Sequence, residues 1–146
     1  STQIDREAGF RAGLAEAGAA LAARTVGNFH YDTAQAAARE MFDVDAPPDA
    51  VFVTNDHMAF AVMDVLRFEL GVRIPDEVSV VGYDDVALAG WPSYNLTTVR
   101  QPANRMAAET VDLLMGRLDD PGMPPRRIEI DGPLIIRGSA RTPQGQ

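Results

Sequence analysis

Residues 78–85 read VSVVGYDD, and this stretch is the clearest indication of the fold. Val78–Tyr83 is β-branched, aromatic or small, with no polar break longer than one serine, which is typical of a strand buried on both faces. The run Ala50–Thr54 has the same character. Strands of this kind belong mostly to parallel sheets, which helices cover on either side. We therefore expect such a sheet at the centre of the chain.

Helical patterns alternate with the strands. Apolar residues at helical spacing predict helices over residues 4–21, 33–42, 56–70 and 102–118. Further strands are predicted at residues 25–29, 96–101, 127–130 and 133–137, and the stretch 119–125, rich in proline and aspartate, predicts a connector. The predicted fold class is α/β, with a mostly parallel sheet and helices on both faces.

Composition bounds the function. The chain has 146 residues, which is one domain or part of one. It contains no cysteine, which excludes disulfides and thiolate chemistry, and all thirteen basic residues are arginine, which excludes lysine Schiff bases. The formal net charge is −8, and a surface this acidic repels phosphate backbones and anionic membranes. The chain by itself is therefore a poor candidate for gripping nucleic acid or a membrane surface.

Enzyme motifs are missing from the sequence. Asp84-Asp85 after a buried strand resembles a phosphoacceptor site, but the lysine that such sites use is not in the chain. There is no G-x-G-x-x-G loop and no G-x-S-x-G elbow. His30 and His57 have no third ligand at metal spacing. We predict no catalytic residues, no metal and no cofactor.

Polar and aromatic residues follow three of the predicted strands. Phe29, Asn55-Asp56 and Asp84-Asp85 stand where ligands bind in open α/β sheets, beyond the carboxyl ends of the strands, and Arg6 opens the first helix. Together they suit a small polyhydroxylated or heterocyclic ligand. Each also has a structural explanation, which stays open here: a helix cap, a turn, a core aromatic or a surface ion pair.

The third predicted helix is apolar around most of its circumference. One stripe consists of Ala59, Val62, Met63, Leu66 and Leu70, and further apolar residues lie on other faces. Such a helix is either wholly buried or partly covered by a partner. The pattern leaves both possibilities open.

Five runs of sequence, in order, resemble the LacI/GalR family of bacterial transcriptional regulators. They are DREAGF at 5–10, VTNDHMA at 53–59, GVRIPDEVSVVGYDD at 71–85, LTTVRQP at 96–102 and LIIRGS at 134–139. The resemblance implies a type I periplasmic-binding-protein fold with the effector held between two lobes. It also implies a cytoplasmic regulator of transcription that is not an enzyme. The alternative is a solute-binding protein of a sugar transport system.

The resemblance also implies a domain organisation. Residues 1–95 and 123–146 would form the C-terminal effector-binding lobe, and residues 96–122 resemble the segment that crosses into the N-terminal lobe. The rest of that lobe and the DNA-binding headpiece, through which the family contacts operator DNA, have no counterpart in this sequence. We therefore expect weak or no effector binding by the chain alone, and we expect residues 96–118 to pack differently or against a neighbouring chain.

Site residues follow from the resemblance position by position. Arg6, Asn55 and Asp84 match residues that bond the effector, a sugar or a related small molecule, and Phe29 matches an aromatic that stacks on it. The third helix matches a dimer-forming element. The expected homodimer interface consists of Phe60, Met63, Asp64, Arg67 and Phe68.

Overall fold

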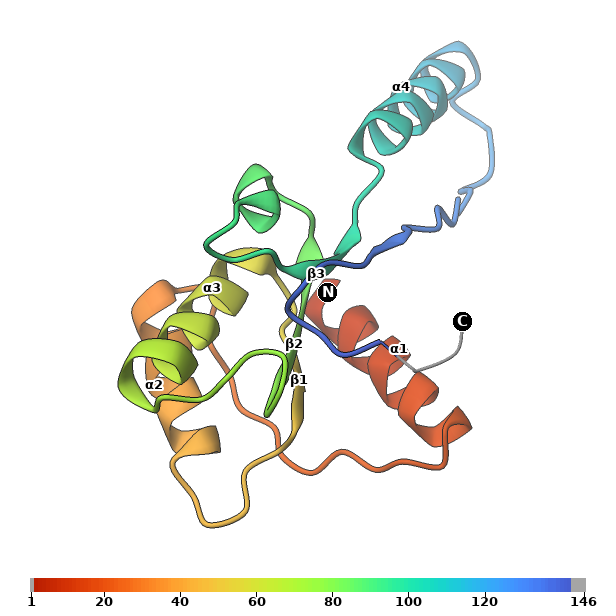
Figure 1. Ribbon diagram of the computed structural model, residues 1–146. Coiled ribbons are helices and arrows are strands. Elements are labelled where there is room, and N and C mark those ends of the chain that lie inside the picture. Colours follow the sequence, from red (N-terminus) through yellow and green to blue (C-terminus); the bar gives the residue numbers. More distant parts are fainter. Residues whose placement is uncertain (1, 143–146) are drawn as a thin grey trace.

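The computed structural model describes residues 2–142 as helices on both faces of a four-stranded sheet (Figure 1). The helices are α1 (Thr2–Glu16), α2 (Tyr31–Phe42), α3 (Asp56–Asp64) and α4 (Ala103–Asp119). A π-helical turn covers Val65–Glu69 and a 3-10 turn covers Ala87–Gly90. The strands are β1 (Ala50–Phe52), β2 (Ser79–Asp84), β3 (Thr97–Arg100) and β4 (Leu134–Ile135). Residues 143–146, which the sequence assigned to the C-terminal lobe, lie outside the described residues.

The sheet has the order β1-β2-β3-β4. The first three strands are parallel, with Val51 opposite Val80 and Val81 opposite Thr97, and β4 runs antiparallel to β3. In Figure 1, α2 and α3 cover one face and α1 lies on the other. The predicted α/β class with a mostly parallel sheet is confirmed.

The core lies between the sheet and the pair α2–α3. Met63 and Leu66 from the α3 side and Val80 and Leu96 from the sheet side are 0% exposed. Alanines such as Ala34 turn inward from α2, and their small side chains allow the two helices to approach closely. The apolar circumference of α3 is thus explained largely by burial within the chain.

Two helices end where the sequence provides a glycine. After α1, the amide of Ala19 donates to the carbonyl of Leu14 and the amide of Gly18 to that of Ala15, with Gly18 at φ 68°. This Schellman arrangement ends the helix at Glu16, before the predicted end at Leu21. The third helix changes to a π-helical turn at Val65, and the chain then leaves at Gly71, with φ 67°.

Two predicted strands are wrong. Residues 25–29 form no strand, because Asn28 and Phe29 take φ of 51° and 60° and the amide of His30 donates to the carbonyl of Gly27 in a tight turn. Residues 25–29 and the edge strand β1 both line an apolar hollow of about 350 Å³, named here the edge hollow, and the two segments do not pair. Residues 127–130 are likewise unpaired in the described part of the chain.

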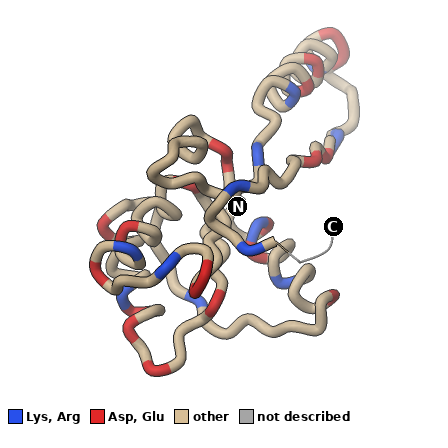
Figure 2. The backbone as a smooth tube through the Cα atoms, viewed as in Figure 1, with Lys and Arg blue, Asp and Glu red and all other residues tan. Residues whose placement is uncertain are grey.

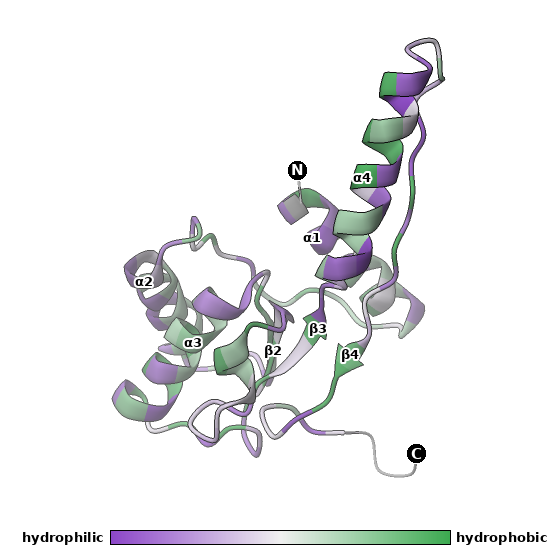
Figure 3. Ribbon diagram, turned by 90° about the horizontal axis from the view of Figure 1, so that it is seen from above, coloured by the Kyte–Doolittle hydropathy of each residue, from purple (hydrophilic) through white to green (hydrophobic). Residues whose placement is uncertain are grey.

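Residues 101–133 leave the sheet as a projection, named here the α4 arm (Figure 1). No residue of α4, which is described over its whole length, is buried, and apolar residues show on its surface (Figure 3). Leu114 is 57% exposed and Leu118 66%. Because β3 pairs with β2, residues 97–100 belong to the sheet. The division into two lobes and the packing of α4 against another chain stay predictions.

Candidate functional site

Arg6 and Asp84 meet at the carboxyl end of the sheet. Arg6 Nη2 lies 3.3 Å from Asp84 Oδ1, and Arg6 Nη1 donates to the carbonyl of Thr54 at 2.5 Å. The guanidinium carbon lies 3.9 Å from the ring centroid of Tyr83, which is a cation–π contact. Both charged side chains are mostly buried, at 13% and 22% exposed. Two of the predicted ligand-binding residues are therefore brought together at the predicted edge.

Asp84 is held in an unusual backbone conformation. Its φ is 126°, which residues other than glycine rarely adopt. Backbone strain of this kind persists only where the surroundings enforce it. Gln101 Nε2 donates to Asp84 Oδ1, and the Gln101 amide donates to the Asp84 carbonyl at 3.3 Å. Backbone strain of this kind clusters at functional sites.

Asn55 and Asp56 are tied into the structure. Asn55 Oδ1 accepts the Met58 amide at 2.8 Å, so Asn55 is the N-cap of α3, as one of the open explanations held. Asp56 is 0% exposed, and its oxygens accept the Thr98 hydroxyl at 2.6 Å and the Val86 amide at 2.9 Å. Burial raises the pKa of the Asp56 carboxyl. Asp56 therefore joins α3 to β2 and β3 from inside.

Phe29 lies on the turn before α2 and is 53% exposed. It lines the edge hollow, whereas Arg6 lines a second hollow of about 560 Å³ between α1 and the sheet, named here the α1 hollow. Phe10 and Phe52 stack with ring centroids 5.0 Å apart and line both hollows. The structure therefore does not bring Phe29 into the Arg6–Asp84 pair.

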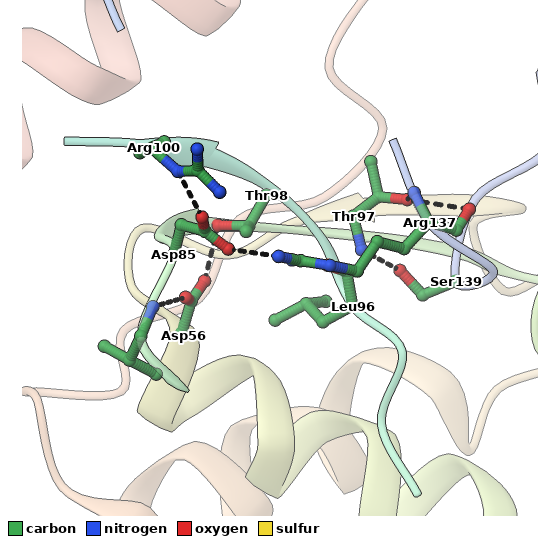
Figure 4. Close-up of polar contacts among 9 residues, drawn as sticks. Asp56, Asp85, Leu96, Thr97, Thr98, Arg100, Arg137 and Ser139 are labelled. Atoms are coloured by element: carbon green, nitrogen blue, oxygen red, sulfur yellow. Dashed lines mark hydrogen bonds and ion pairs between the residues drawn. The ribbon is translucent and has the colours of Figure 1, made fainter. Parts of the chain in front are cut away.

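Sequence reasoning named Asp85 at this edge but missed its arginine partners and the contacts that Tyr83 and Gln101 make. Asp85 is paired with Arg100 and Arg137, and Tyr83 and Gln101 contact Arg6 and Asp84 (Figure 4 for the Asp85 cluster). Burial alone would raise the pKa of Asp85, but the hydrogen bonds from Arg137 and Arg100 outweigh it and lower that pKa. One signal was available in the sequence. Gln101 ends the predicted strand over residues 96–101, which corresponds to β3, and β3 lies beside β2.

The five residues expected at the dimer interface fall into two groups. Phe60 and Met63 are 3% and 0% exposed and lie in the core, so an interface role is carried forward only for the other three. Phe68 on the π-helical turn is 81% exposed. Asp64 accepts the Tyr31 hydroxyl at 2.5 Å, and Arg67 donates to the Ser93 carbonyl at 2.5 Å.

Residues 2–142 hold no group of three or more His, Cys, Asp or Glu side chains arranged for a metal ion. Over the same residues, no helix is both long and apolar enough to cross a membrane.

Residues 1–140 match the model of the periplasmic binding protein-like domain. The chain belongs to this family. The PurR transcriptional repressor of Vibrio atlanticus is 36% identical over 141 residues, which are 95% of this chain and 42% of that protein. The regulator CelR of Thermobifida fusca is 37% identical over 138 residues, covering 93% and 40%. The chain thus spans about two fifths of the length of these curated relatives.

Solved structures of this domain family agree. A CelR–cellobiose complex superposes with a TM-score of 0.86 at 36% identity, over 94% of this chain and 42% of that one. A sugar-binding LacI-family regulator from Escherichia coli, complexed with phosphate, gives 0.80 at 31% identity, over 96% and 50%. The resemblance to LacI-family regulators is confirmed, and the relatives named here are regulators rather than enzymes.

Proposed function

We propose that this chain is the effector-binding and dimerising part of a LacI-type regulator of transcription. The observation that carries the proposal is the ion pair between Arg6 and Asp84 at the carboxyl ends of parallel strands. Open α/β sheets bind their ligands in this position. The strained backbone at Asp84, beside the Arg6 guanidinium, costs stability, and strain of this kind is found mostly at ligand-binding and other functional sites.

The pair has the chemistry to hold a sugar. The guanidinium of Arg6 donates and the carboxylate of Asp84 accepts, so two neighbouring hydroxyls can each find a charged partner. Charge-assisted hydrogen bonds of this kind are worth about 1.5–3 kcal/mol each. The α1 hollow beside the pair, lined by Phe10, Phe52 and Tyr83, offers apolar surface for a ring face. Asn55, which follows Thr54 directly, is a further proposed contact, and Phe29 stays a proposed contact although it lines the edge hollow and not the α1 hollow.

The relatives support a regulator over a transport receptor, because those named above are transcriptional regulators. The cellobiose complex supports a sugar as the effector. Because of the PurR relatives, purines are the second class of candidate effector. The net charge of −8 disfavours contact between this chain and DNA, so we place operator binding on a headpiece outside it, in a cytoplasmic protein. Ligand would then act by binding one of two conformations more tightly.

The test is a nuclear magnetic resonance titration of the isotope-labelled chain with cellobiose, other sugars and purine bases. We expect weak binding that shifts the amides of Arg6, Thr54 and Asp84 with at least one ligand. Asp84→Asn removes one charged partner and is expected to weaken that binding by about tenfold or more.

Asp49→Asn is the matched control. Its side chain is 85% exposed and pairs with Arg141 away from the Arg6–Asp84 pair, so binding at that pair should be unchanged. Ligand shifts that avoid the Arg6–Asp84 pair, or unchanged affinity in Asp84→Asn, would contradict the proposal.

A further inference from the structure

Asp85 is a nearly buried carboxylate with both oxygens occupied by arginine. Its side chain is 5% exposed. Oδ1 accepts Arg137 Nη2 at 2.6 Å, and Oδ2 accepts Arg100 Nε at 2.5 Å (Figure 4). Hydrogen bonds between charged groups at these lengths are strong, and solvent screens the pair with Arg137, whose side chain is 18% exposed, less than the pair with Arg100, which is 52% exposed. This cluster of three side chains is named here the Asp85 clamp.

The two arginines come from the two strands that carry the α4 arm. Arg100 is the last residue of β3, where the chain leaves the sheet, and its amide donates to the carbonyl of Pro133 at 2.9 Å. Arg137 follows β4, where the chain has returned, and its Nη1 donates to the carbonyl of Leu96 at 2.7 Å. Basic residues therefore mark the base of the arm (Figure 2). One carboxylate joins the outgoing strand to the returning one.

The clamp lies next to the strained backbone of Asp84, the proposed ligand-binding residue. Asp84 and Asp85 have φ of 126° and 57°, and the amide of Val86 is held by Asp56 Oδ2. Conformations this rare persist only when the surroundings determine them from several sides. While Asp85 pairs with Arg100 and Arg137, Asp84 pairs with Arg6 and receives a hydrogen bond from Gln101, the first residue of the arm.

We propose that Asp85 is a positioning residue that aims Asp84 at Arg6 and fixes the direction of the α4 arm, so that the two are coupled. The part that concerns ligand rests on the proposed function. Loss of the carboxylate charge leaves two arginines without a counter-charge, and both strands at the base of the arm lose a common anchor. The arm then samples a wider range of directions, and the turn at Asp84 relaxes with it.

The test measures the direction of the arm by pulsed electron paramagnetic resonance on the full chain. The sequence has no cysteine, so Ala36→Cys on α2 and Ala108→Cys on α4 give two unique label sites, both exposed. We expect one narrow distance distribution with Asp85 in place and a broadened or shifted one in Asp85→Asn. In the same variant the amide resonances of Asp84 and Arg6 should move.

Two further variants make the test specific. Arg100→Gln removes half of the clamp at a 52% exposed side chain and leaves Asp85 paired with Arg137, so it tests the same point if Asp85→Asn does not fold. Asp49→Asn removes an exposed ion pair to Arg141, in the chain that follows β4, and should change neither readout. Thermal unfolding of each variant separates a loss of fold from a loss of arm direction.

An unchanged distance distribution in folded Asp85→Asn or Arg100→Gln would overturn the proposal, as would an equal effect of Asp49→Asn. Moved arm distances with unmoved Asp84 and Arg6 resonances would overturn the coupling. Ligand binding gives a separate measurement. If a sugar binds, Asp85→Asn should weaken the binding and Asp49→Asn should not. Unchanged sugar affinity in Asp84→Asn contradicts the proposed function and leaves the result on the clamp intact.

Discussion

At the scale of single residues, the aspartates of this chain do different work because their surroundings differ. Asp56 is fully buried, accepts hydrogen bonds from Thr98 and Val86, and has its pKa raised by burial. Asp85 has its pKa lowered by two arginines. Asp64 lies near the surface and accepts the hydroxyls of Tyr31 and, at 3.4 Å, Tyr94. The residue type is the same in each case, so the role is set by the partners.

Tyr31 provides a pH test of this surface. The hydrogen bond to Asp64, followed by burial, raises its pKa from 10.0 to about 12. Because the pKa is higher in the folded chain, the stability that this contact contributes is fully present below about pH 10 and is lost as the pH rises towards about 12. Burial and Asp64 raise the pKa of Tyr94 as well, so titration of the tyrosinate absorbance should show late ionisation of two tyrosines, and Tyr31→Phe should remove the step near pH 12. Ionisation of all three tyrosines together near the ordinary value would contradict the contact.

At the scale of elements, Gly82 decides how closely α3 approaches the sheet. A Cβ at this position would overlap Asp56 Oδ1 and would lie 2.9 Å from Leu96 Cδ2. The first residue of α3 therefore sits directly over the middle of β2. Asp56 can then reach Thr98 on β3 and the Val86 amide beyond β2, which joins three elements through one side chain.

Gly82→Ala is expected to lower the free energy of unfolding by about 1–3 kcal/mol, because the added methyl group has no space in a packed core. Urea unfolding measures it. Gly9→Ala is the matched control: nothing lies within 4 Å of its added Cβ in α1, and alanine favours a helix over glycine by up to about 1 kcal/mol. If Gly82→Ala is as stable as the original chain, the close approach of α3 to β2 is incorrect.

At the scale of the whole molecule, the proposed dimer face is the surface at the C-terminal end of α3 and on the π-helical turn that follows it. Phe68 is 81% and Trp91 56% exposed. Asp64 and Arg67 are bonded to Tyr31 and to the carbonyl of Ser93, so they are held in place for a partner. Exposed aromatic residues beside ordered charged ones are typical of protein interfaces.

Phe68→Glu should shift the chain from dimer to monomer, because a buried charge replaces an aromatic contact. Sedimentation equilibrium over a range of concentrations measures the change. Val44→Glu, at a side chain that is 51% exposed after α2, is the control and should leave the dimer intact. A monomeric original chain, or equal dissociation by both variants, would rule out this face.

The sequence by itself determined the α/β class, the four helices, the strands β1 to β4 and the place of Asp84 at the carboxyl end of a strand. These features follow from local periodicity and from the rule that parallel strands present their carboxyl ends at one edge. Burial patterns of this kind depend on a few consecutive residues. They can therefore be predicted without knowing which distant residues pack against them.

Only the tertiary structure decided the rest. Positive φ at Asn28 and Phe29 turns the chain within Thr25–Phe29, and this segment does not pair with β1, although a strand needs a neighbour for its backbone hydrogen bonds. Phe60 and Met63 share one apolar helix with Phe68, and contact with α2 and the sheet determined which of them is buried. The arginines of the Asp85 clamp lie 15 and 52 residues away from Asp85. Partners at that distance depend on how the chain folds back, which no local pattern contains.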